Sequence, residues 1–456
     1  MRMLPEEFLK RIIHQSYIDS AGLADALNQP SETSVRVNRH KWPHPVEGYE
    51  NVGWEPDGYY LPGRTLFTPD PLFHAGVYYP QESSSMFAGE LFRQLTVGMT
   101  GLRVLDLCGA PGGKATHLSA LLPDDGLLVA NEVIRARAAV LAENITKWGM
   151  GNTVVTQNDP ARFASLPGFF DVMVADAPCS GEGMFRSSAA VQEWSLQNTR
   201  LCSERQRRIV MEAWPALKPG GILIYSTCTF NPAENEENIS WLMETTGAEP
   251  LTADLSGTTG VTVISHAGIP GYGFHPGRVR GEGFFIAALR KPAGPAPSRR
   301  DARRAMLKSS SAAFSRAEPL TEFDRSRMIM ADSRIIALAA DPDVASHLSE
   351  RLTVLKLGTM IGEMKNDDLV PAHDLAMSVR QKRSSWPEYE LSYDEAVSFL
   401  RLELTPAASM PRGRVLMIYR GVPLGFGNNL GSRLNNGYPQ SWRIRMEKQP
   451  GFKEIL

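Results

Sequence analysis

Between residues 100 and 290, short apolar runs alternate with longer stretches that have helical spacing. The apolar runs have the length of β-strands and lie at 103–107, 127–131, 153–156, 172–175 and 222–226. Helical stretches such as 134–148 and 199–217 separate them. Strands that alternate with helices favour a parallel sheet flanked by helices. The sequence therefore predicts an α/β fold here, with 218–221 as the turn into the fifth strand and 283–289 closing the sheet edge.

The regions on either side have different patterns. Residues 5–27 have helical periodicity, with Phe8, Ile12, Ile13 and Tyr17 on one side. A short strand is predicted at 33–39, and the following stretch to residue 80 is rich in Pro, Gly and aromatic residues. Near the C-terminus, 414–419 is predicted as a strand, and 421–427, with three glycines and a proline, as a turn-rich segment.

Changes in composition divide the chain into domains. Residues 291–311 are rich in Pro, Ala, Ser and Arg, which is typical of a linker. The predicted division is an N-terminal domain (1–95), the α/β domain (96–291), a linker (292–312), an intermediate α+β domain (313–385) and a last α+β domain (386–456).

The composition narrows the class of protein. Of 456 residues, 43% are apolar and 21% are charged, which suits a soluble globular protein of two to four domains. No apolar run approaches the roughly 20 residues that cross a bilayer, and the N-terminus lacks the apolar stretch of a signal peptide. Four cysteines without a CxxC pair predict reduced thiols and a cytoplasmic location. Nothing in the sequence requires more than a monomer.

The net charge of −2 does not favour nucleic-acid binding by the protein as a whole, so any RNA-binding surface must be local. Most short runs of charge are only solvated faces. The candidate basic clusters are Arg135/Arg137, Arg205/Arg207/Arg208, Arg278/Arg280 and Arg299/Arg300/Arg303/Arg304.

A polar functional group stands at the end of each of five successive predicted strands. These groups are Asp106, Glu132, Asp159, Asp176 and Cys228. Ligands of an open parallel sheet bind outside the carboxyl ends of its strands, so a ligand site is expected there. Glu132 suits the two hydroxyl groups of a ribose, and Asp159 could accept from an adenine amino group. The alternative for either acid is a helix N-cap.

The first strand is followed by a glycine-rich turn, Cys108-Gly109-Ala110-Pro111-Gly112-Gly113-Lys114. Glycine has no side chain, so backbone at this turn can approach a ligand closely. The turn is not a GxGxxG motif, and alone it is a weak signal.

Two cysteines follow two different strands: Cys179 in DAPCSG and Cys228 in YSTCT. A thiolate can add to carbon 6 of a pyrimidine, which makes carbon 5 nucleophilic towards a methyl donor. The proton on carbon 5 must then leave, and a second thiolate could act as the base. Asp176 could stabilise the adduct at ring nitrogen 3, and Lys114 could hold Asp176 or contact the base. Cys202 and Cys108 are predicted to be packing residues.

These segments resemble the RNA 5-methylcytosine methyltransferases of the NOL1/NOP2/Sun group, and within it the RsmF/YebU type. The resemblance covers roughly residues 75–291, and the segment SVRVN at 34–38 also fits. The motifs that carry it are YPQESSSM at 79–86, DLCGAPGGK at 106–114, DAPCSGEGMF at 176–185, STCT at 226–229, NPAENE at 231–236 and EGFF at 282–285. The C-terminal part is weakly similar to PUA RNA-binding domains through 421–427 and WRIR at 442–445.

The resemblance implies a Rossmann-like methyltransferase core that uses S-adenosylmethionine, with RNA-binding domains at both ends and no metal. It implies that Cys228 is the covalent nucleophile and that Cys179 releases the product. Thr229 stands where the family commonly has serine, which keeps the hydroxyl group. The implied substrate is cytosine in 16S ribosomal RNA, either free or within the 30S subunit. The implied cofactor-binding residues are Cys108, Gly109, Ala110, Pro111, Gly112, Gly113, Lys114, Glu132, Arg137, Asp159 and Asp176.

The sequence leaves three alternative functions. A transfer RNA methyltransferase of the same family would share every motif at the cytosine, although the C-terminal extension favours ribosomal RNA. An RNA-binding assembly factor without catalysis is disfavoured by the intact Cys179, Cys228, Asp176 and Lys114. A nicotinamide-dependent dehydrogenase is disfavoured because GxGxxG is missing.

Overall fold

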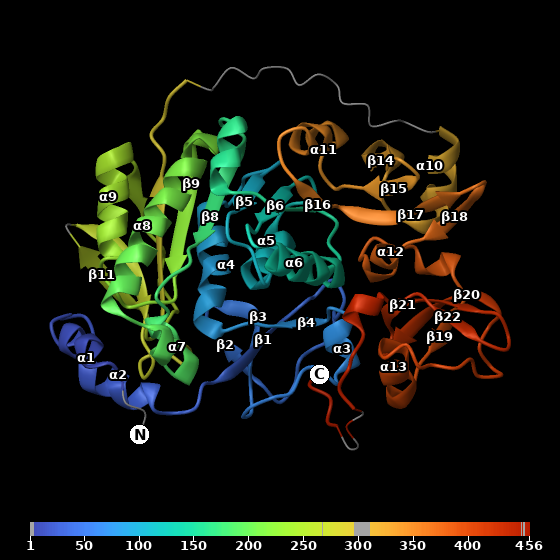
Figure 1. The fold of residues 1–456 in the computed structure, drawn as a ribbon, viewed down its shortest axis with the longest axis horizontal. Coiled ribbons are helices and arrows are strands. Elements are labelled where there is room, and N and C mark those ends of the chain that lie inside the picture. Colours follow the sequence, from blue (N-terminus) through green and yellow to red (C-terminus); the bar gives the residue numbers. More distant parts are fainter. Residues whose placement is uncertain (1–3, 267, 296–310, 448, 450–451) are drawn as a thin grey trace.

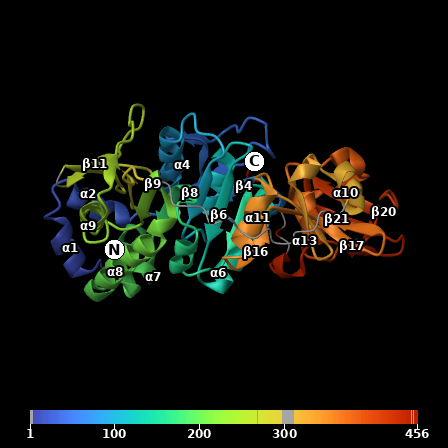
Figure 2. The ribbon, with the colours of Figure 1, turned by 90° about the horizontal axis from the view of Figure 1, so that it is seen from above.

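The computed structural model describes residues 4–266, 268–295, 311–447, 449 and 452–456. Seen from above, the molecule is elongated, with the N-terminal helices at one end and the C-terminal modules at the other (Figure 2). A large central sheet lies between them (Figure 1). Within the described residues, no helix combines the length and the apolar character needed to cross a bilayer.

The central sheet contains the five predicted parallel strands. Its order is β11-β12-β13-β9-β8-β5-β6-β7-β16, and β10 pairs with β13. The strands are β5 (Arg103–Asp106), β6 (Leu127–Asn131), β7 (Thr153–Thr156), β8 (Phe170–Asp176), β9 (Leu217–Thr227), β10 (Glu249–Leu251), β11 (Thr262–His266), β12 (Ile269–Phe274), β13 (Phe284–Arg290) and β16 (Val354–Leu357). The strand predicted at 283–289 is confirmed as β13, which runs antiparallel to β9. Its predicted place at the sheet edge is wrong, because β12 pairs with its other side and β11 forms that edge.

The parallel strands are arranged around β5. From β5 the chain passes outward through β6 and β7, and it then returns to the other side of β5 for β8 and β9. The strand order therefore reverses between β5 and β8, and such a switch point is where open α/β sheets bind their ligands. The predicted turn at 218–221 lies inside β9 as an irregular stretch. Leu217 pairs with Phe170, and the next parallel pair joins Ile222 to Val172.

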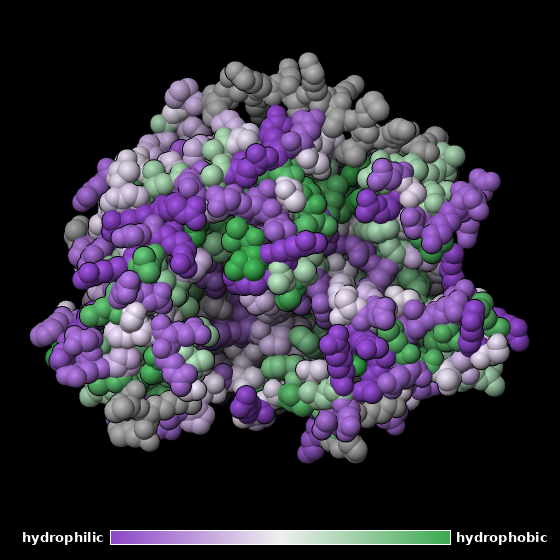
Figure 3. All heavy atoms as spheres, in the orientation of Figure 1, coloured by the Kyte–Doolittle hydropathy of each residue, from purple (hydrophilic) through white to green (hydrophobic). Residues whose placement is uncertain are grey.

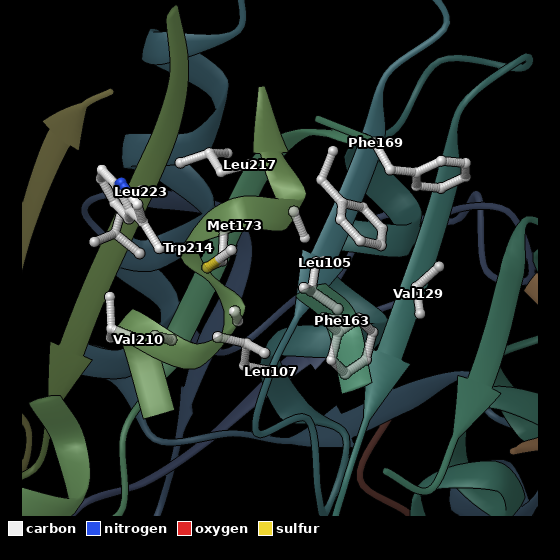
Figure 4. Close-up of a cluster of buried hydrophobic side chains, with 14 of the residues drawn as sticks. Leu105, Leu107, Val129, Phe163, Phe169, Met173, Val210, Trp214, Leu217 and Leu223 are labelled. Atoms are coloured by element: carbon white, nitrogen blue, oxygen red, sulfur yellow. The ribbon is translucent and has the colours of Figure 1, made fainter. Parts of the chain in front are cut away.

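Helices cover both faces of this sheet, because successive residues of its strands point to opposite sides. On one face, Leu105, Val129 and Met173 belong to a buried cluster that also contains Val210 of α8. Figure 4 shows Val129 beside Phe163 and Phe169 in this cluster. On the other face, Val104, Leu128 and Val172 pack with α4, α5 and α6. The helices are α4 (Ser83–Leu95), α5 (Gly113–Leu121), α6 (Arg135–Trp148), α7 (Ser188–Glu193), α8 (Leu196–Ala213) and α9 (Glu236–Thr246). With these side chains buried, the face in Figure 3 is mostly hydrophilic, with apolar residues in small groups.

The N-terminal part is a small α+β layer. Its sheet has the order β2-β3-β1-β4. Its elements are α1 (Glu6–Ile12), α2 (Ser20–Leu27), β1 (Thr33–Val37), β2 (Glu50–Val52), β3 (Glu55–Leu61), α3 (Pro71–His74) and β4 (Tyr78–Pro80).

The helical stretch predicted at 5–27 is two helices rather than one. Asp19 begins α2 by accepting a hydrogen bond from the backbone N–H of Gly22. Between the two helices, the side chain of Gln15 donates from Nε2 to the carbonyl oxygen of Phe230. Phe8 and Ile12 are buried as predicted, whereas Ile13 is 67% exposed.

The C-terminal half contains two further four-stranded sheets, with the orders β14-β15-β17-β18 and β19-β20-β21-β22. Their elements are α10 (Ser311–Ala317), β14 (Met328–Ala331), β15 (Arg334–Ala337), α11 (Pro342–Ser349), β17 (Thr359–Lys365), β18 (Asp368–Pro371), α12 (His373–Met377), β19 (Glu388–Glu390), α13 (Tyr393–Leu400), β20 (Gly413–Tyr419), β21 (Val422–Asn429) and β22 (Leu434–Asn436). Most of the predicted linker, 296–310, lies outside the described residues, and so does its cluster Arg299/Arg300/Arg303/Arg304.

The prediction of a turn-rich segment at 421–427 is wrong, because most of it is the strand β21. The turn is confined to Arg420 and Gly421, which have positive φ angles. After the turn, Val422, Leu424 and Phe426 are all buried. The glycines obscured this alternation of apolar residues in the sequence.

The intermediate part also contributes to the central sheet. Strand β16, from the predicted domain 313–385, pairs antiparallel with β7. Leu348 and Leu352 next to it share the core that contains Phe163 and Phe169 of the α/β part. No sequence pattern distinguishes a short strand that joins a distant sheet from one that joins its own, so this pairing was not predicted.

Candidate functional site

The glycine-rich turn lies between β5 and α5. The N–H of Gly109 donates to the carbonyl oxygen of Asn131 at 2.8 Å, which holds the turn against the end of β6. Gly112 has a φ of +125°, a conformation that favours glycine, and α5 begins at the next residue. The peptide bond between Ala110 and Pro111 is cis. The predicted cofactor segment therefore forms a tight turn at the switch point of the sheet.

Asp106 ends β5 beneath this turn and is fully buried. Its Oδ1 atom accepts from the N–H of Cys108 at 3.3 Å, whereas Oδ2 has no hydrogen-bond partner. Burial, reinforced by the charge of Asp176, raises the pKa of Asp106 to about 7. The sequence placed Asp106 at a strand end but assigned no role to it. Its unpaired oxygen identifies it as a candidate ligand-binding group.

Glu132 and Arg137 lie on the β6 side of the turn. Glu132 is 3% exposed; it accepts from the N–H of Ile134 at 2.9 Å and pairs with Arg137 at 3.1 Å. Arg137 also donates to the carbonyl oxygen of Ala110 at 2.9 Å. The structure thus brings these two predicted residues together with the glycine turn.

Asp159 has a different environment. It caps the 3-10 turn Pro160–Ser165 by accepting from the N–H of Ala161 at 3.1 Å. Its side chain is 48% exposed and lies 3.5 Å from the guanidinium group of Arg208. The geometry matches the capping alternative, and the contact with adenine stays a prediction.

The two predicted catalytic cysteines are in direct contact. Cys179 follows β8 and Cys228 follows β9, and their sulfur atoms lie 2.8 Å apart. The N–H of Cys228 also donates to the sulfur of Cys179 at 3.2 Å. The hydrogen bond with Cys228, together with burial, raises the pKa of Cys179 well above its ordinary value. Cys179 therefore keeps its proton at neutral pH in the resting protein.

Asp176 and Lys114 form an ion pair beside the cysteines. The Nζ atom of Lys114 lies 2.9 Å from Oδ2 of Asp176, and Ser226 donates to Oδ1 at 2.8 Å. Burial alone would lower the pKa of Lys114, but the carboxylate of Asp176 outweighs it and the pKa is raised. Lys114 lies in the first turn of α5, directly after the glycine turn. The ion pair therefore links the predicted cofactor segment to the cysteines.

Glu234 supports the loop that carries Cys179, and sequence reasoning assigned it no role. Its carboxylate accepts from the N–H of Ser180 and from the Nε2 of Gln206, each at 2.9 Å. Gln206 also donates to the carbonyl oxygen of Pro178 at 3.0 Å. Burial raises the pKa of Glu234 to about 7. The signal that could have found Glu234 is its place in the NPAENE motif after β9.

The other two cysteines are inside the fold. Cys202 lies within α8 and is 3% exposed, and burial raises its pKa to about 11. Burial also raises the pKa of Cys108. Both surroundings suit the packing role predicted from the sequence.

The predicted basic clusters are only partly free of internal contacts. Arg207 lies over the ring of Trp241 and donates to Asn238, whereas Arg280 lies over Tyr60 and pairs with Glu50. Arg135, Arg205 and Arg278 are exposed. Arg137 and Arg208 are exposed as well, and they form ion pairs with Glu132 and Glu212.

A cavity of about 630 Å³ lies elsewhere, between the loop at 42–49 and the C-terminal residues Ile455 and Leu456. None of the predicted catalytic or cofactor-binding residues lines it. We place the candidate site at the switch point because the buried acids, the glycine turn and the paired thiols converge there.

Three families of domains match the chain. Residues 99–290 match the 16S rRNA methyltransferase RsmB/F domain, and 4–83 match the N-terminal domain of 16S rRNA methyltransferase RsmF. Residues 387–444 match the RsmF PUA domain.

Whole proteins are similar as well. The ribosomal RNA small subunit methyltransferase F of Cronobacter sakazakii is 30% identical, over 96% of this chain and 96% of that protein. A methyltransferase homologue from Pyrococcus horikoshii is 26% identical and has a TM-score of 0.52, covering 63% of this chain and 100% of that one. NSun6 from Pyrococcus horikoshii, solved with the S-adenosylmethionine analogue SFG, has a TM-score of 0.52 at 19% identity, over 63% of this chain and 98% of that one. The chain belongs to the RsmF family of RNA methyltransferases, which use S-adenosylmethionine.

Proposed function

We propose that this protein methylates carbon 5 of cytosine in 16S ribosomal RNA, through a covalent bond between Cys228 and carbon 6. The observation that carries the proposal is the contact between the Cys179 and Cys228 sulfur atoms, beside the ion pair of Asp176 and Lys114. Two adjacent thiols suit a reaction that needs both a nucleophile and a base. The match to the RsmF family supports the choice of RNA.

The residues at the switch point fit S-adenosylmethionine. The unpaired Oδ2 of Asp106 suits the ammonium group of the methionine part, because a buried carboxylate gains most from a cationic partner. Glu132 would accept hydrogen bonds from the ribose, and Asp159 could accept from the adenine amino group. The segment from Cys108 to Lys114 would bring its backbone close to the cofactor. When bound, the cofactor supplies an electrophilic methyl group.

Cys228 begins the reaction by adding its sulfur to carbon 6. The electron pair of the 5,6 double bond forms a 4,5 double bond, and the electrons of the double bond between nitrogen 3 and carbon 4 move to nitrogen 3. The proton lost by the thiol ends on nitrogen 3. Asp176 accepts a hydrogen bond from that N–H, and Lys114 holds the carboxylate in place at 2.9 Å. Carbon 5 of the adduct is then nucleophilic.

Cys179 ends the reaction. Cys179 releases its proton to solvent after the adduct has formed. Once carbon 5 is methylated, the proton of carbon 5 passes to this thiolate. The electrons of that C–H bond restore the 5,6 double bond, and the bond from carbon 6 to sulfur breaks so that Cys228 leaves as a thiolate. The Cys228 thiolate then takes back the proton from nitrogen 3. Formation of the adduct removes the hydrogen bond with Cys228, the largest cause of the raised pKa of Cys179, so Cys179 can ionise for this step.

The test is to incubate purified protein and labelled S-adenosylmethionine with 16S RNA, and separately with 30S subunits, from a strain that lacks the gene. Label mapped to carbon 5 of a cytosine, and abolished by Cys228→Ala, is the expected result. Label on transfer RNA alone would mean that transfer RNA is the substrate, while the proposed mechanism would be unchanged. Cofactor binding without label on any RNA would favour an assembly factor instead.

A further inference from the structure

Strand β16 fastens the C-terminal half to the edge of the catalytic sheet beside the candidate cofactor site. Lys356 pairs with Val155, and Leu357 pairs with Val154. Two backbone bonds flank the pairing, from Gln157 N–H to the carbonyl oxygen of Thr353 at 3.0 Å and from Gly358 N–H to Thr153 at 3.0 Å. The attachment therefore reaches the carboxyl end of β7, where the loop to Asp159 begins.

At the end of β7, the side chain of Asn158 adds two hydrogen bonds to the residue that precedes β16. Its Nδ2 donates to the carbonyl oxygen of Thr353 at 3.2 Å, and its Oδ1 accepts from the N–H of Thr353 at 3.0 Å. Asn158 is 6% exposed. A primary amide can donate and accept at the same time, so asparagine satisfies both backbone groups of one residue.

The backbone of Asn158 is bonded in turn to the side chain of Asn131 at the end of β6. Asn131 donates to the carbonyl oxygen of Asn158 at 2.9 Å and accepts from its N–H at 3.0 Å. Asn131 is 1% exposed, and its own carbonyl oxygen accepts from Gly109 of the glycine turn at 2.8 Å. A continuous chain of hydrogen bonds thus runs from Thr353 through Asn158 and Asn131 to Gly109.

Three of the four residues in this series of hydrogen bonds adjoin or belong to segments assigned to the cofactor. Asn131 precedes Glu132, Asn158 precedes Asp159, and Gly109 belongs to the glycine turn. Loops that are already held in the binding conformation cost less entropy when a ligand orders them. Loss of the Asn158 amide would leave the N–H of Thr353 unpaired, whereas the carbonyl oxygen of Thr353 would keep its bond from Gln157. The loop that starts at Asn158 would then be held less firmly against the C-terminal half.

We propose that Asn158 is a positioning residue for S-adenosylmethionine, and that the C-terminal half, through Thr353, completes the cofactor site rather than serving RNA binding alone. This proposal rests on the assignment of Glu132 and Asp159 to the cofactor in the proposed function.

The experiment measures the Kd of S-adenosylmethionine by calorimetry, in the full chain and without RNA. Asn158→Ala is expected to raise the Kd by about five- to tenfold, the effect of losing one or two buried hydrogen bonds. Asn152→Ala is the matched control. Asn152 is also a buried asparagine beside β7, but at the opposite end, where it bonds Ser119 at 2.8 Å. It should lower the melting temperature to a similar degree and leave the Kd within about twofold.

The outcomes separate positioning from stability. An unchanged Kd in folded Asn158→Ala overturns the proposal, and so does an equal rise in both alanine variants. Asn158→Asp is the milder variant: it keeps the acceptor for the N–H of Thr353 but cannot donate to its carbonyl oxygen, so its Kd should rise too. Glu132→Ala is run in parallel. If Glu132→Ala binds S-adenosylmethionine with the native Kd, the cofactor site of the proposed function is wrong. That result differs from an unchanged Kd in Asn158→Ala alone, which would exclude only the positioning role of Asn158.

Discussion

The sulfur atoms of Cys179 and Cys228 lie 2.8 Å apart although 49 residues separate them in the chain. The contact follows from the sheet, because β8 and β9 are adjacent parallel strands and each cysteine follows the end of its strand. Neighbouring parallel strands present their carboxyl ends side by side. The fold therefore places two thiols side by side, as the proposed reaction requires of its nucleophile and its base.

Replacing Cys228 should stop the reaction without unfolding the protein. Cys228→Ala is expected to lower kcat by at least about 1,000-fold, because the proposed covalent adduct forms on the sulfur that this variant lacks. The matched control is Cys202→Ala, which removes a buried thiol of α8 and should cost about 1 kcal/mol of stability while activity remains. Methyl transfer assays and melting temperatures check both variants. Appreciable turnover by Cys228→Ala would exclude it as the nucleophile.

Lys114→Met should slow the chemical step by leaving Asp176 without its cation. We expect the single-turnover rate at saturating cofactor to fall by about 10- to 100-fold. Saturation matters because Lys114 also belongs to the predicted cofactor segment. Lys114→Arg keeps the charge and should recover part of the rate. A methionine variant as fast as the native protein would show that the ion pair has no role in the reaction.

Asp106→Asn should make the cofactor-free protein more stable and should weaken the binding of S-adenosylmethionine. The pKa of Asp106 is raised to about 7, so between about pH 4 and pH 7 the folded state holds a proton that the unfolded state has lost. Stability from this group is therefore full below that window and is lost as the pH rises through 7. Asparagine does not titrate, so between pH 5 and pH 8 the variant should gain about 2–3 kcal/mol of stability relative to the native protein.

The same variant tests the role of Asp106 in binding. Its Kd for S-adenosylmethionine at pH 8 should rise by about tenfold or more, because the ammonium group loses a charged partner. Denaturant titrations at the two pH values and calorimetry provide the measurements. A gain in stability with unchanged affinity would separate Asp106 from the cofactor.

Glu234→Gln should disturb product release more than adduct formation. The carboxylate accepts from both the N–H and the hydroxyl of Ser180, and a glutamine amide cannot accept at both oxygen positions. Cys179, one residue earlier, should be misplaced, and covalent protein–RNA complex should accumulate. The matched control is Glu236→Gln, a buried acid that contacts Tyr17 instead. Gel analysis of the complex that finds no difference between the two variants would contradict the role of Glu234.

Much of the catalytic domain could be predicted from local patterns. The strands at 127–131 and 153–156 have their predicted bounds, because apolar runs of strand length between helical stretches leave few alternatives. The paired cysteines followed from the same reasoning, since residues after adjacent parallel strands must converge. The order of the strands was not predicted, because periodicity does not specify which strands are neighbours in a sheet.

Other features depend on contacts between distant segments. The pairing of β16 with β7 joins residues about 200 positions apart, and no local pattern encodes it. Asp159 was predicted to contact adenine, but its local environment is that of a cap, with Arg208 nearby. Glu234 gains its place only when α8 brings Gln206 against it. The contacts with β7, Arg208 and Gln206 form only in the folded protein, so local sequence patterns do not reveal them.

The most direct test of the covalent mechanism is to isolate the protein–RNA adduct formed by Cys179→Ala and identify the attached residue by peptide mass spectrometry. The mechanism predicts accumulation of an adduct with RNA bonded to Cys228, and its loss when Cys228→Ala is added. An adduct that accumulates in the Cys228→Ala protein, with RNA bonded to Cys179, would reverse the two roles and contradict the account.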